Sequence, residues 1–259
     1  MNAAIPRRRK PVMIFLLAIF LIPLAARAVL YGMSDAPRSY RDADWSSAGT
    51  LPAAAADKDA RVLFFTGTTG GWKGVFSVHS WVVFKRANAK NWTRYDVVGW
   101  GVPLRSNGWA PDGRWFGNMP QVIADVSGTQ AETMIPKVEA AITNYRYRHA
   151  GDYRIWPGPN SNSFVAAVLR AVPELAVALP PNAVGRDFRD GFYAGRTDSG
   201  TGVELNLAGY AGIKAGWVEG LEVNLLGLVA GIDWRYPALK LPGFGRIGVA
   251  PATAVAATR

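Results

Sequence analysis

Val75-Phe76-Ser77-Val78-His79-Ser80-Trp81-Val82-Val83-Phe84 is rich in β-branched and aromatic side chains, a composition that favours a strand. The polar stretch 86–91 follows as a turn, and residues 92–100 return as a second strand. If this hairpin is symmetric about residues 88–89, Trp81 lies opposite Asp96. Asp96 then shares a face of the sheet with His79 and lies diagonally from it.

The segments around this hairpin predict an α+β fold, in which an antiparallel sheet packs against a few helices. Val62-Leu63-Phe64-Phe65 is a short apolar run typical of a buried strand. Residues 101–128 contain Gly, Pro, Asn and Asp throughout, so we expect a long loop with short strands. Thr129–Glu132 matches a capping box, and the main helix is expected to start near Ile135 because Pro136 suits a first helical turn.

The C-terminal part of the chain contains a short repeat. Val203–Gly209 resembles Leu221–Gly227, and each copy has the pattern Glu-x-Asn-Leu flanked by apolar residues. Two copies predict two repeated strands of a small antiparallel unit rather than a solenoid, which needs three or more repeats. Residues 239–248 end this unit, and 249–259 are expected to be a frayed tail.

The N-terminus predicts a membrane segment. Arg7-Arg8-Arg9-Lys10 precedes an apolar run from Pro11 to Ala26, and this order of charge and apolarity sends the following chain across a membrane. Ala26-Arg27-Ala28 has the small-x-small pattern of a signal-peptide cleavage site. Alternatively, Pro11–Gly32 is an uncleaved anchor about 33 Å long. Both alternatives place the bulk of the chain in the periplasm, outside the inner membrane.

These patterns divide the chain into four segments. They are an anchor or signal peptide at 1–32, a linker at 33–60, an α+β core at 61–175 and a β-rich extension at 176–259.

The composition excludes several classes of protein. The chain of 259 residues is 49% hydrophobic, which excludes a disordered polymer. It has no cysteine and two histidines, so disulfides, thiolate metal sites and cysteine nucleophiles are absent and a multi-histidine metal centre is nearly excluded. Half of the net charge of +10 lies in the first 28 residues, so nucleic acid is not an expected partner. No cofactor is implied.

One segment after the core strands could carry chemistry. Asn160-Ser161-Asn162-Ser163-Phe164 opens a predicted helix that runs from Ser161 to Val172, with Asn160 as its N-cap. A serine at a helix start is surrounded by backbone N–H groups that suit an oxyanion. The sequence does not decide between Ser161 and Ser163 as the exposed hydroxyl.

A serine nucleophile needs a base and a group that orients the base. His79 is the candidate base, because His149 lies in a polar, surface-like stretch. Asp96 is the candidate orienting group. Six further residues are candidates for ligand binding, with a structural cap, loop-bracing or core role as the alternative for each: Asn160, Ser163, Trp81, Arg114, Trp115 and Trp156.

The pairing of a strand histidine with a helix-start motif resembles a known group. His79 followed later by Asn160-Ser161-Asn162-Ser163-Phe164 is similar to circularly permuted papain-like proteins, which include lecithin–retinol acyltransferase-like enzymes and relatives of NlpC-type peptidases. Beyond residue 60, the chain resembles a bacterial family of unknown function, number 3750. Its hallmarks here are Trp156–Phe164, Arg114–Asn118 and Leu241–Gly248.

The resemblance departs from the papain-like pattern at one position. Those enzymes use a cysteine thiolate where this chain has Ser161, and a serine needs stronger help from a general base. The resemblance therefore implies either a serine variant of the enzyme or an inactive descendant.

Three functions remain open from the sequence. The first is a serine-dependent hydrolase or acyltransferase that acts on an amide or ester. The second is an inactive envelope module that binds a peptide, glycan or lipid, with Trp115 and Trp156 as platforms. The third is a structural protein whose apolar stretch from Leu221 to Ile232 docks on a partner or the bilayer.

Overall fold

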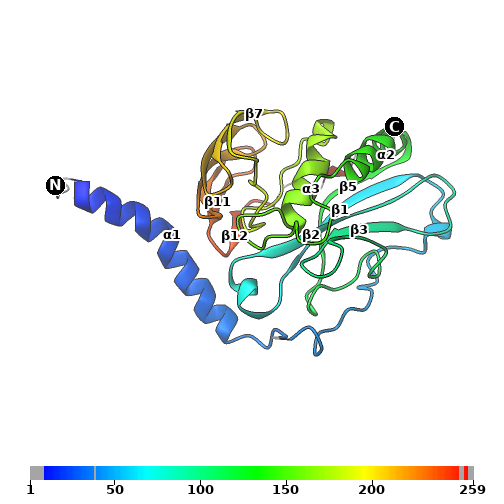
Figure 1. Ribbon diagram of the computed structural model, residues 1–259, viewed down its shortest axis with the longest axis horizontal. Helices are drawn as coiled ribbons and strands as arrows, with labels where there is room; N and C mark the ends of the chain where they lie inside the picture. The colour runs from blue at the N-terminus through cyan, green and yellow to red at the C-terminus, as the bar shows by residue number, and fades with distance from the viewer. Residues whose placement is uncertain (1–8, 38, 251–253, 256–259) are drawn as a thin grey trace.

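The computed structural model describes residues 9–37, 39–250 and 254–255. It contains an N-terminal helix, a sheet of seven strands, and a sheet of six strands with two helices against it (Figure 1). Antiparallel pairing dominates both sheets, which confirms the predicted α+β class.

The first helix is the candidate membrane segment. Helix α1 spans Arg9–Gly32 and contains Pro23 in its interior. Within it, Ile14–Gly32 is apolar and long enough to cross a membrane, and only 11% of its most apolar window is buried. A signal peptide has the same properties. Arg7 and Arg8 of the predicted basic cluster lie outside the described residues.

The six-stranded sheet has the strand order β13-β5-β1-β2-β3-β4. Its neighbouring strands are antiparallel, except that β13 and β5 are parallel. The strands are β1 (Arg61–Thr68), β2 (Val78–Lys85), β3 (Thr93–Val97), β4 (Leu104–Ser106), β5 (Gln121–Ser127) and β13 (Ala254–Val255).

Both faces of the six-stranded sheet are covered, one by the two helices and the other by loops. Helix α2 (Gly128–Thr143) packs against β1 and β5, and helix α3 (Ser161–Arg170) packs against β2 and β3. The apolar core includes Phe64, Val82 and Phe164. A second cluster, built around Phe65 and Trp81, contains tryptophans from the loops. Every residue of β2 is therefore buried, which explains its continuous apolar run.

The seven-stranded sheet is a meander in which the strands follow chain order from β6 to β12. The strands are β6 (Phe192–Arg196), β7 (Gly202–Leu207), β8 (Ala211–Gly216), β9 (Gly220–Leu225), β10 (Leu228–Asp233), β11 (Ala238–Leu241) and β12 (Gly245–Gly248). The two sequence repeats form β7 and β9, as predicted, and β8 lies between them. The described residues also contain three short 3-10 turns: η1 (Ala54–Ala56), η2 (Gly71–Val75) and η3 (Pro173–Leu175).

The start of α2 corrects the predicted helix. The helix begins at Gly128 rather than near Ile135, its N-cap is Ser127 without a side-chain cap, and Pro136 lies in its interior. The predicted capping box at Thr129–Glu132 is therefore wrong. Burial of the turn that precedes Pro136 explains the difference, because packing of Ala131 and Met134 in the core outweighs the proline's missing hydrogen bond.

Three loop predictions also need correction. Residues 121–127 of the expected loop at 101–128 form β5, which is longer than the short strands expected there and pairs with β1 along nearly its whole length. The expected linker at 33–60 packs against the loops beside the six-stranded sheet. The ring of Trp45 contacts that of Trp115, and Ser47 forms an isolated β-bridge with Gly113. In the expected frayed tail, Ala254–Val255 pairs with β5, and residues 251–253 and 256–259 lie outside the described residues.

Candidate functional site

Two neighbouring strands bring His79 and Asp96 together. The β2–β3 pairs Val82–Tyr95 and Val83–Arg94 have the register that the symmetric hairpin predicted. Nε2 of His79 lies 2.8 Å from Oδ1 of Asp96, and both side chains are buried. The predicted contact between the imidazole and the carboxylate is therefore present.

Arg94 holds Asp96 in its ionised form. Its Nε and Nη2 atoms donate to the two oxygens of Asp96 at 2.7 and 2.8 Å, and the whole group is buried. Burial on its own would raise the pKa of Asp96, but the charge of Arg94 and the hydrogen bonds from His79 and Arg94 bring that pKa below its ordinary value. The carboxylate therefore acts only as a hydrogen-bond acceptor.

This carboxylate fixes the tautomer of His79. An ionised Asp96 requires a proton on Nε2, which leaves the lone pair of the neutral ring on Nδ1. Burial lowers the pKa of His79, and the positive charges of Arg94 and Lys73 act in the same direction, against the opposing influence of Asp96. The imidazole is therefore neutral at pH 7 and can accept a proton.

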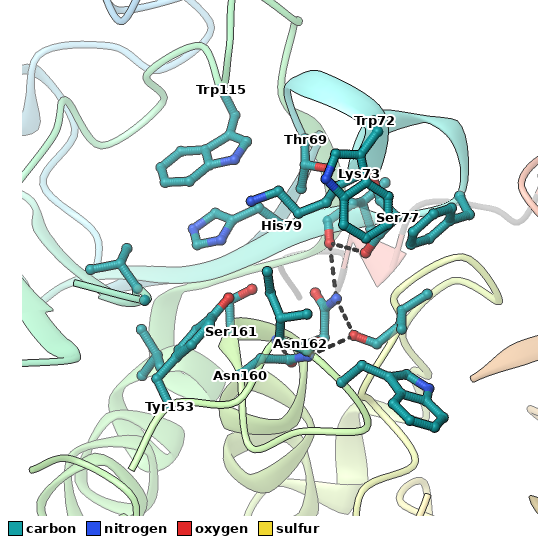
Figure 2. A pocket seen from close by; sticks show the side chains of 18 of the residues that line it. Thr69, Trp72, Lys73, Ser77, His79, Trp115, Tyr153, Asn160, Ser161 and Asn162 are labelled. Carbon is teal, nitrogen blue, oxygen red and sulfur yellow. Dashed lines mark hydrogen bonds between the residues drawn. The ribbon is translucent and has the colours of Figure 1, made fainter. Parts of the chain in front are cut away.

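Trp115 fixes the orientation of the imidazole. Its ring stacks on His79 with 3.6 Å between centroids and 7° between planes. Figure 2 shows Trp115 on one side of His79 and Ser161 on the other. This stacking limits rotation of the histidine side chain and keeps Nδ1 in one direction.

Ser161 is the first residue of α3, as predicted. The Asn160 side chain accepts hydrogen bonds from the backbone N–H groups of Asn162 and Ser163, and Ser163 Oγ accepts one from the Asn160 N–H. This reciprocal cap defines the helix start. Two of the helix-start amides expected to bind an oxyanion are therefore occupied, and the Ser161 N–H is the one without a partner among the described residues.

The two serines have different surroundings. Ser163 Oγ is buried and bonded to Asn160, so its role is the cap. Ser161 lines a cavity together with His79. Within the described part of the chain, neither Ser161 Oγ nor His79 Nδ1 has a hydrogen-bond partner, so no hydrogen bond joins these two atoms. The structure thus places Ser161, and not Ser163, at the cavity.

Asn162 fastens the start of α3 to β2. Its Oδ1 accepts a hydrogen bond from Ser80 at 2.8 Å, and its Nδ2 donates to the carbonyls of Val78 and Val184. Ser80 and Val78 flank His79 on β2. These contacts fix the start of α3, with Ser161, against the residues that flank His79 in the sequence.

The cavity has a volume of about 590 Å³, within the usual range for ligand sites. Its wall is mainly apolar, and the apolar residues come from both sheets, the connecting loops and α1: Leu24, Phe76, Val97, Val98, Ile155, Val184, Leu226 and Leu228. Its polar lining residues include Ser161, Lys73 and Tyr153 (Figure 2).

The predicted binding residues divide into two groups. Asn160, Trp115 and Trp156 line the cavity, although the Asn160 side chain is occupied by the cap. Trp81 is fully buried outside the cavity, where it stacks on Phe65 and its ring lies 4.2 Å from the Arg94 guanidinium. Geometry therefore gives Trp81 a supporting role and no contact with a ligand.

Arg114 and Ser163 also lie outside the cavity wall. Arg114 donates to the Ser47 carbonyl at 2.8 Å and lies 3.5 Å from Asp44, so it fastens the segment 33–60 to the loop that contains Arg114. Among the described residues, no cluster of three or more His, Asp or Glu side chains is arranged to hold a metal ion.

Sequence reasoning missed three residues of the site. Arg94 lies two positions before Asp96 on the same strand face, and this spacing was a usable signal. Tyr153 lines the cavity, and burial raises the pKa of its hydroxyl. The Asn162 side chain contacts β2 across 84 residues of sequence, and no local sequence pattern predicts such a contact.

Comparison with known proteins gives a family and no function. No curated protein and no solved structure matches the chain. A family described as a protein of unknown function (DUF3750) matches residues 59–188, half of the chain. This range includes His79, Asp96 and Ser161 and ends before the seven-stranded sheet begins. The chain belongs to the DUF3750 family.

Proposed function

We propose that this protein is a serine-dependent hydrolase or acyltransferase, anchored at a membrane by α1, with Ser161 as nucleophile and His79 as general base. The observation that carries the proposal is the arrangement around one cavity: the Ser161 hydroxyl and His79 line it, and Asp96 holds the other ring nitrogen at 2.8 Å. A helix-start nucleophile beside a strand histidine also supports the permuted papain-like resemblance.

The chemistry follows from these positions. Ser161 Oγ attacks the carbonyl carbon of an ester or amide, and its proton passes to Nδ1 of His79. His79 then gives that proton to the departing alcohol or amine as the acyl–oxygen or acyl–nitrogen bond breaks. Water or an acceptor alcohol next attacks acyl-Ser161, and His79 takes and returns a proton in the same way.

Two groups are placed to stabilise the negative charge that develops on the carbonyl oxygen. The Ser161 N–H is the unoccupied amide at the start of α3. Tyr153 lines the same cavity as Ser161, and among the described residues its hydroxyl has no hydrogen-bond partner. We assign these two donors to the oxyanion.

The cavity wall supports an apolar acyl group as substrate. Valine, leucine, isoleucine and aromatic side chains line the cavity, and Leu24 of α1 belongs to the same wall. An acyl chain matches such a wall better than a peptide or sugar, whose polar groups would lose their hydrogen bonds to water.

Activity-based labelling tests the proposal. Full-length protein in detergent is treated with a fluorophosphonate and with p-nitrophenyl esters of short and long acyl chains. We expect Ser161 to be labelled, Ser161→Ala to abolish labelling, and longer acyl chains to be preferred. Ser77→Ala is the matched control, because Ser77 lines the same cavity and its hydroxyl contacts only the Val78 carbonyl.

The variant Ser161→Cys adds a second test, since the chain has no other cysteine. We expect this thiol to react with iodoacetamide faster at pH 7 than an ordinary thiol, and a further His79→Ala change to remove that advantage. Equal rates for Ser161→Cys with and without His79 would contradict base assistance.

Binding without catalysis is a second candidate, favoured by one observation: no hydrogen bond joins Ser161 Oγ to His79. In that case the cavity retains an acyl ligand without cleaving it. Tight binding of a fatty acid together with no labelling of Ser161 would select this function.

A further inference from the structure

The seven-stranded sheet carries its polar side chains inside and its apolar side chains outside. In β7, Glu204 and Asn206 are almost completely buried, whereas Val203, Leu205 and Leu207 are more than half exposed. A sheet on the surface of a water-soluble protein has the opposite arrangement, with apolar residues facing the core.

Strand β9 repeats this inversion. Glu222 and Asn224 are buried, and Leu221, Val223 and Leu225 are exposed. The repeated Glu-x-Asn-Leu motif therefore encodes an inward polar row and an outward apolar row.

Strand pairing joins the outward side chains into continuous rows. One row crosses six strands through Val203, Ala215, Leu221, Ile232, Leu239 and Ile247. A second row contains Leu205, Ile213 and Val223. The large side chains of these two rows are 37–65% exposed, and together they form the outer face of the sheet. Contiguous apolar surface of this kind marks an interaction site.

The inner face cannot accept these side chains, because charges fill it. Lys214 lies between Glu204 and Glu222 across β7, β8 and β9, and Glu222 also pairs with Lys240 and Arg186. Sheets that face lipid have this alternation, in which polar side chains point inward and apolar side chains point outward.

Aromatic residues flank the outer face at both ends of the strands. Trp217 and Trp234 lie in turns at one end, and both are exposed. Tyr210 lies in a turn at the other end, with its ring 4.9 Å from that of Trp156. Tryptophan and tyrosine are the residues that gather at the boundary between water and hydrocarbon.

Helix α1 contacts the same sheet. It packs against β10 and β11, and Figure 1 shows this sheet between α1 and α3. The exposed side chains of α1, such as Ile14 and Ile22, are as apolar as the outer face. The candidate membrane helix and the outer face are therefore both apolar, and they belong to elements that contact one another.

We propose that the outer face lies on the lipid bilayer that holds α1. The edge strands β6 and β12 have unpaired backbone groups, which cannot enter hydrocarbon without water. The sheet therefore rests at the depth of the headgroups and upper acyl chains, with its aromatic ends in the interface. This contact does not depend on catalysis by Ser161.

Site-directed spin labelling tests the contact, and the absence of native cysteine makes each label unique. Nitroxides are attached to Leu205→Cys and Val223→Cys in full-length protein reconstituted in phosphatidylcholine–phosphatidylglycerol vesicles. Collision rates with oxygen, which concentrates in lipid, and with a water-soluble nickel chelate are then measured. Glu132→Cys on α2 is the control exposed to water, and Ile22→Cys on α1 is the control in the membrane.

We expect the labels at Leu205 and Val223 to have an oxygen-to-nickel ratio several-fold above that at Glu132 and below that at Ile22. A ratio equal to that at Glu132 would overturn the proposal, even if Ile22 is in lipid. Protection from both reagents would also overturn it, because a protein then covers the face, and dipolar coupling between labels would identify a second copy of this chain.

Discussion

The two sheets of this protein use the same alternation of polar and apolar residues in opposite ways. In the six-stranded sheet, apolar side chains are buried on both faces, and the ion pair of Arg94 and Asp96 is enclosed with His79 among aromatic rings. In the seven-stranded sheet, charges fill the inside and apolar residues point outward. Period-two patterning thus tells which residues share a face, and the environment of each face decides which one is buried.

The comparison also separates two uses of buried charge. The group around Asp96 borders the cavity and fixes a histidine tautomer. The network around Lys214 and Glu222 joins strands of the second sheet and does not line the cavity. We therefore expect changes in the first group to affect activity and changes in the second to affect stability.

The largest effect is expected for Asp96→Asn. An amide can donate to Nε2, which moves the imidazole proton to Nδ1 and removes the base, so labelling of Ser161 should fall about 10⁴-fold. Labelling rate per folded molecule is the measurement. Glu222→Gln, in the charge network of the other sheet, should keep the wild-type rate. An unchanged labelling rate for Asp96→Asn would contradict the proposed roles of Ser161, His79 and Asp96.

The next largest effect is expected from shortening an apolar side chain, which should change the free energy of unfolding differently in the two sheets. Phe64→Ala leaves a cavity in the core and should lower the free energy of unfolding by about 3–5 kcal/mol. Leu205→Ala on the outer face should change it by no more than about 0.5 kcal/mol in detergent, because that side chain packs against little protein. Urea unfolding followed by tryptophan fluorescence measures both. Equal losses would show that the outer face is packed.

Removing one buried charge from the seven-stranded sheet tests how much its inner charge network contributes to stability. Lys214 lies 2.6 Å from Asp187. Burial would raise the pKa of Asp187, but Lys214 and Arg186 lower it to about 2. Lys214→Met leaves this carboxylate underpaired and should cost about 3 kcal/mol of unfolding free energy. Lys90→Met, at an exposed position, is the control and should leave the unfolding midpoint unchanged.

The smallest effect concerns pH. Burial lowers the pKa of His79 below its ordinary value of 6.5, so the neutral base persists at that pH. An unperturbed imidazole would be half protonated there, whereas labelling of Ser161 should lose less than about half of its rate between pH 8 and 6.5. A midpoint at or above pH 6.5 would contradict the buried, neutral histidine.

The same pKa shift has a consequence for stability. The folded protein binds the His79 proton less tightly than the unfolded chain does. The contribution of the buried neutral ring is therefore complete above pH 6.5 and is lost as the pH falls from 6.5 toward the folded pKa. Unfolding midpoints measured between pH 8 and 5 should decline only in the acidic part of this range.

Local signals predicted much of the site. The apolar run of β2 and its turn placed His79 opposite β3 with the right register, and Asn160 predicted the start of α3. Local signals misplaced the start of α2 and predicted only short strands where the seven-residue β5 forms. In both cases burial against β1 decided the structure, and burial depends on segments distant in sequence.

The sequence by itself determined the α+β class, the apolar N-terminal helix, the histidine–aspartate register and the serine at a helix start. These depend on periodicity, capping and turn symmetry, which act over a few residues. Only the tertiary structure decided that Ser161 and not Ser163 faces the cavity, that Arg94 keeps Asp96 ionised, and that the C-terminal sheet turns its charges inward. Each of these depends on what packs against a side chain from far along the chain, and it is this packing that sets solvent access and charge pairing.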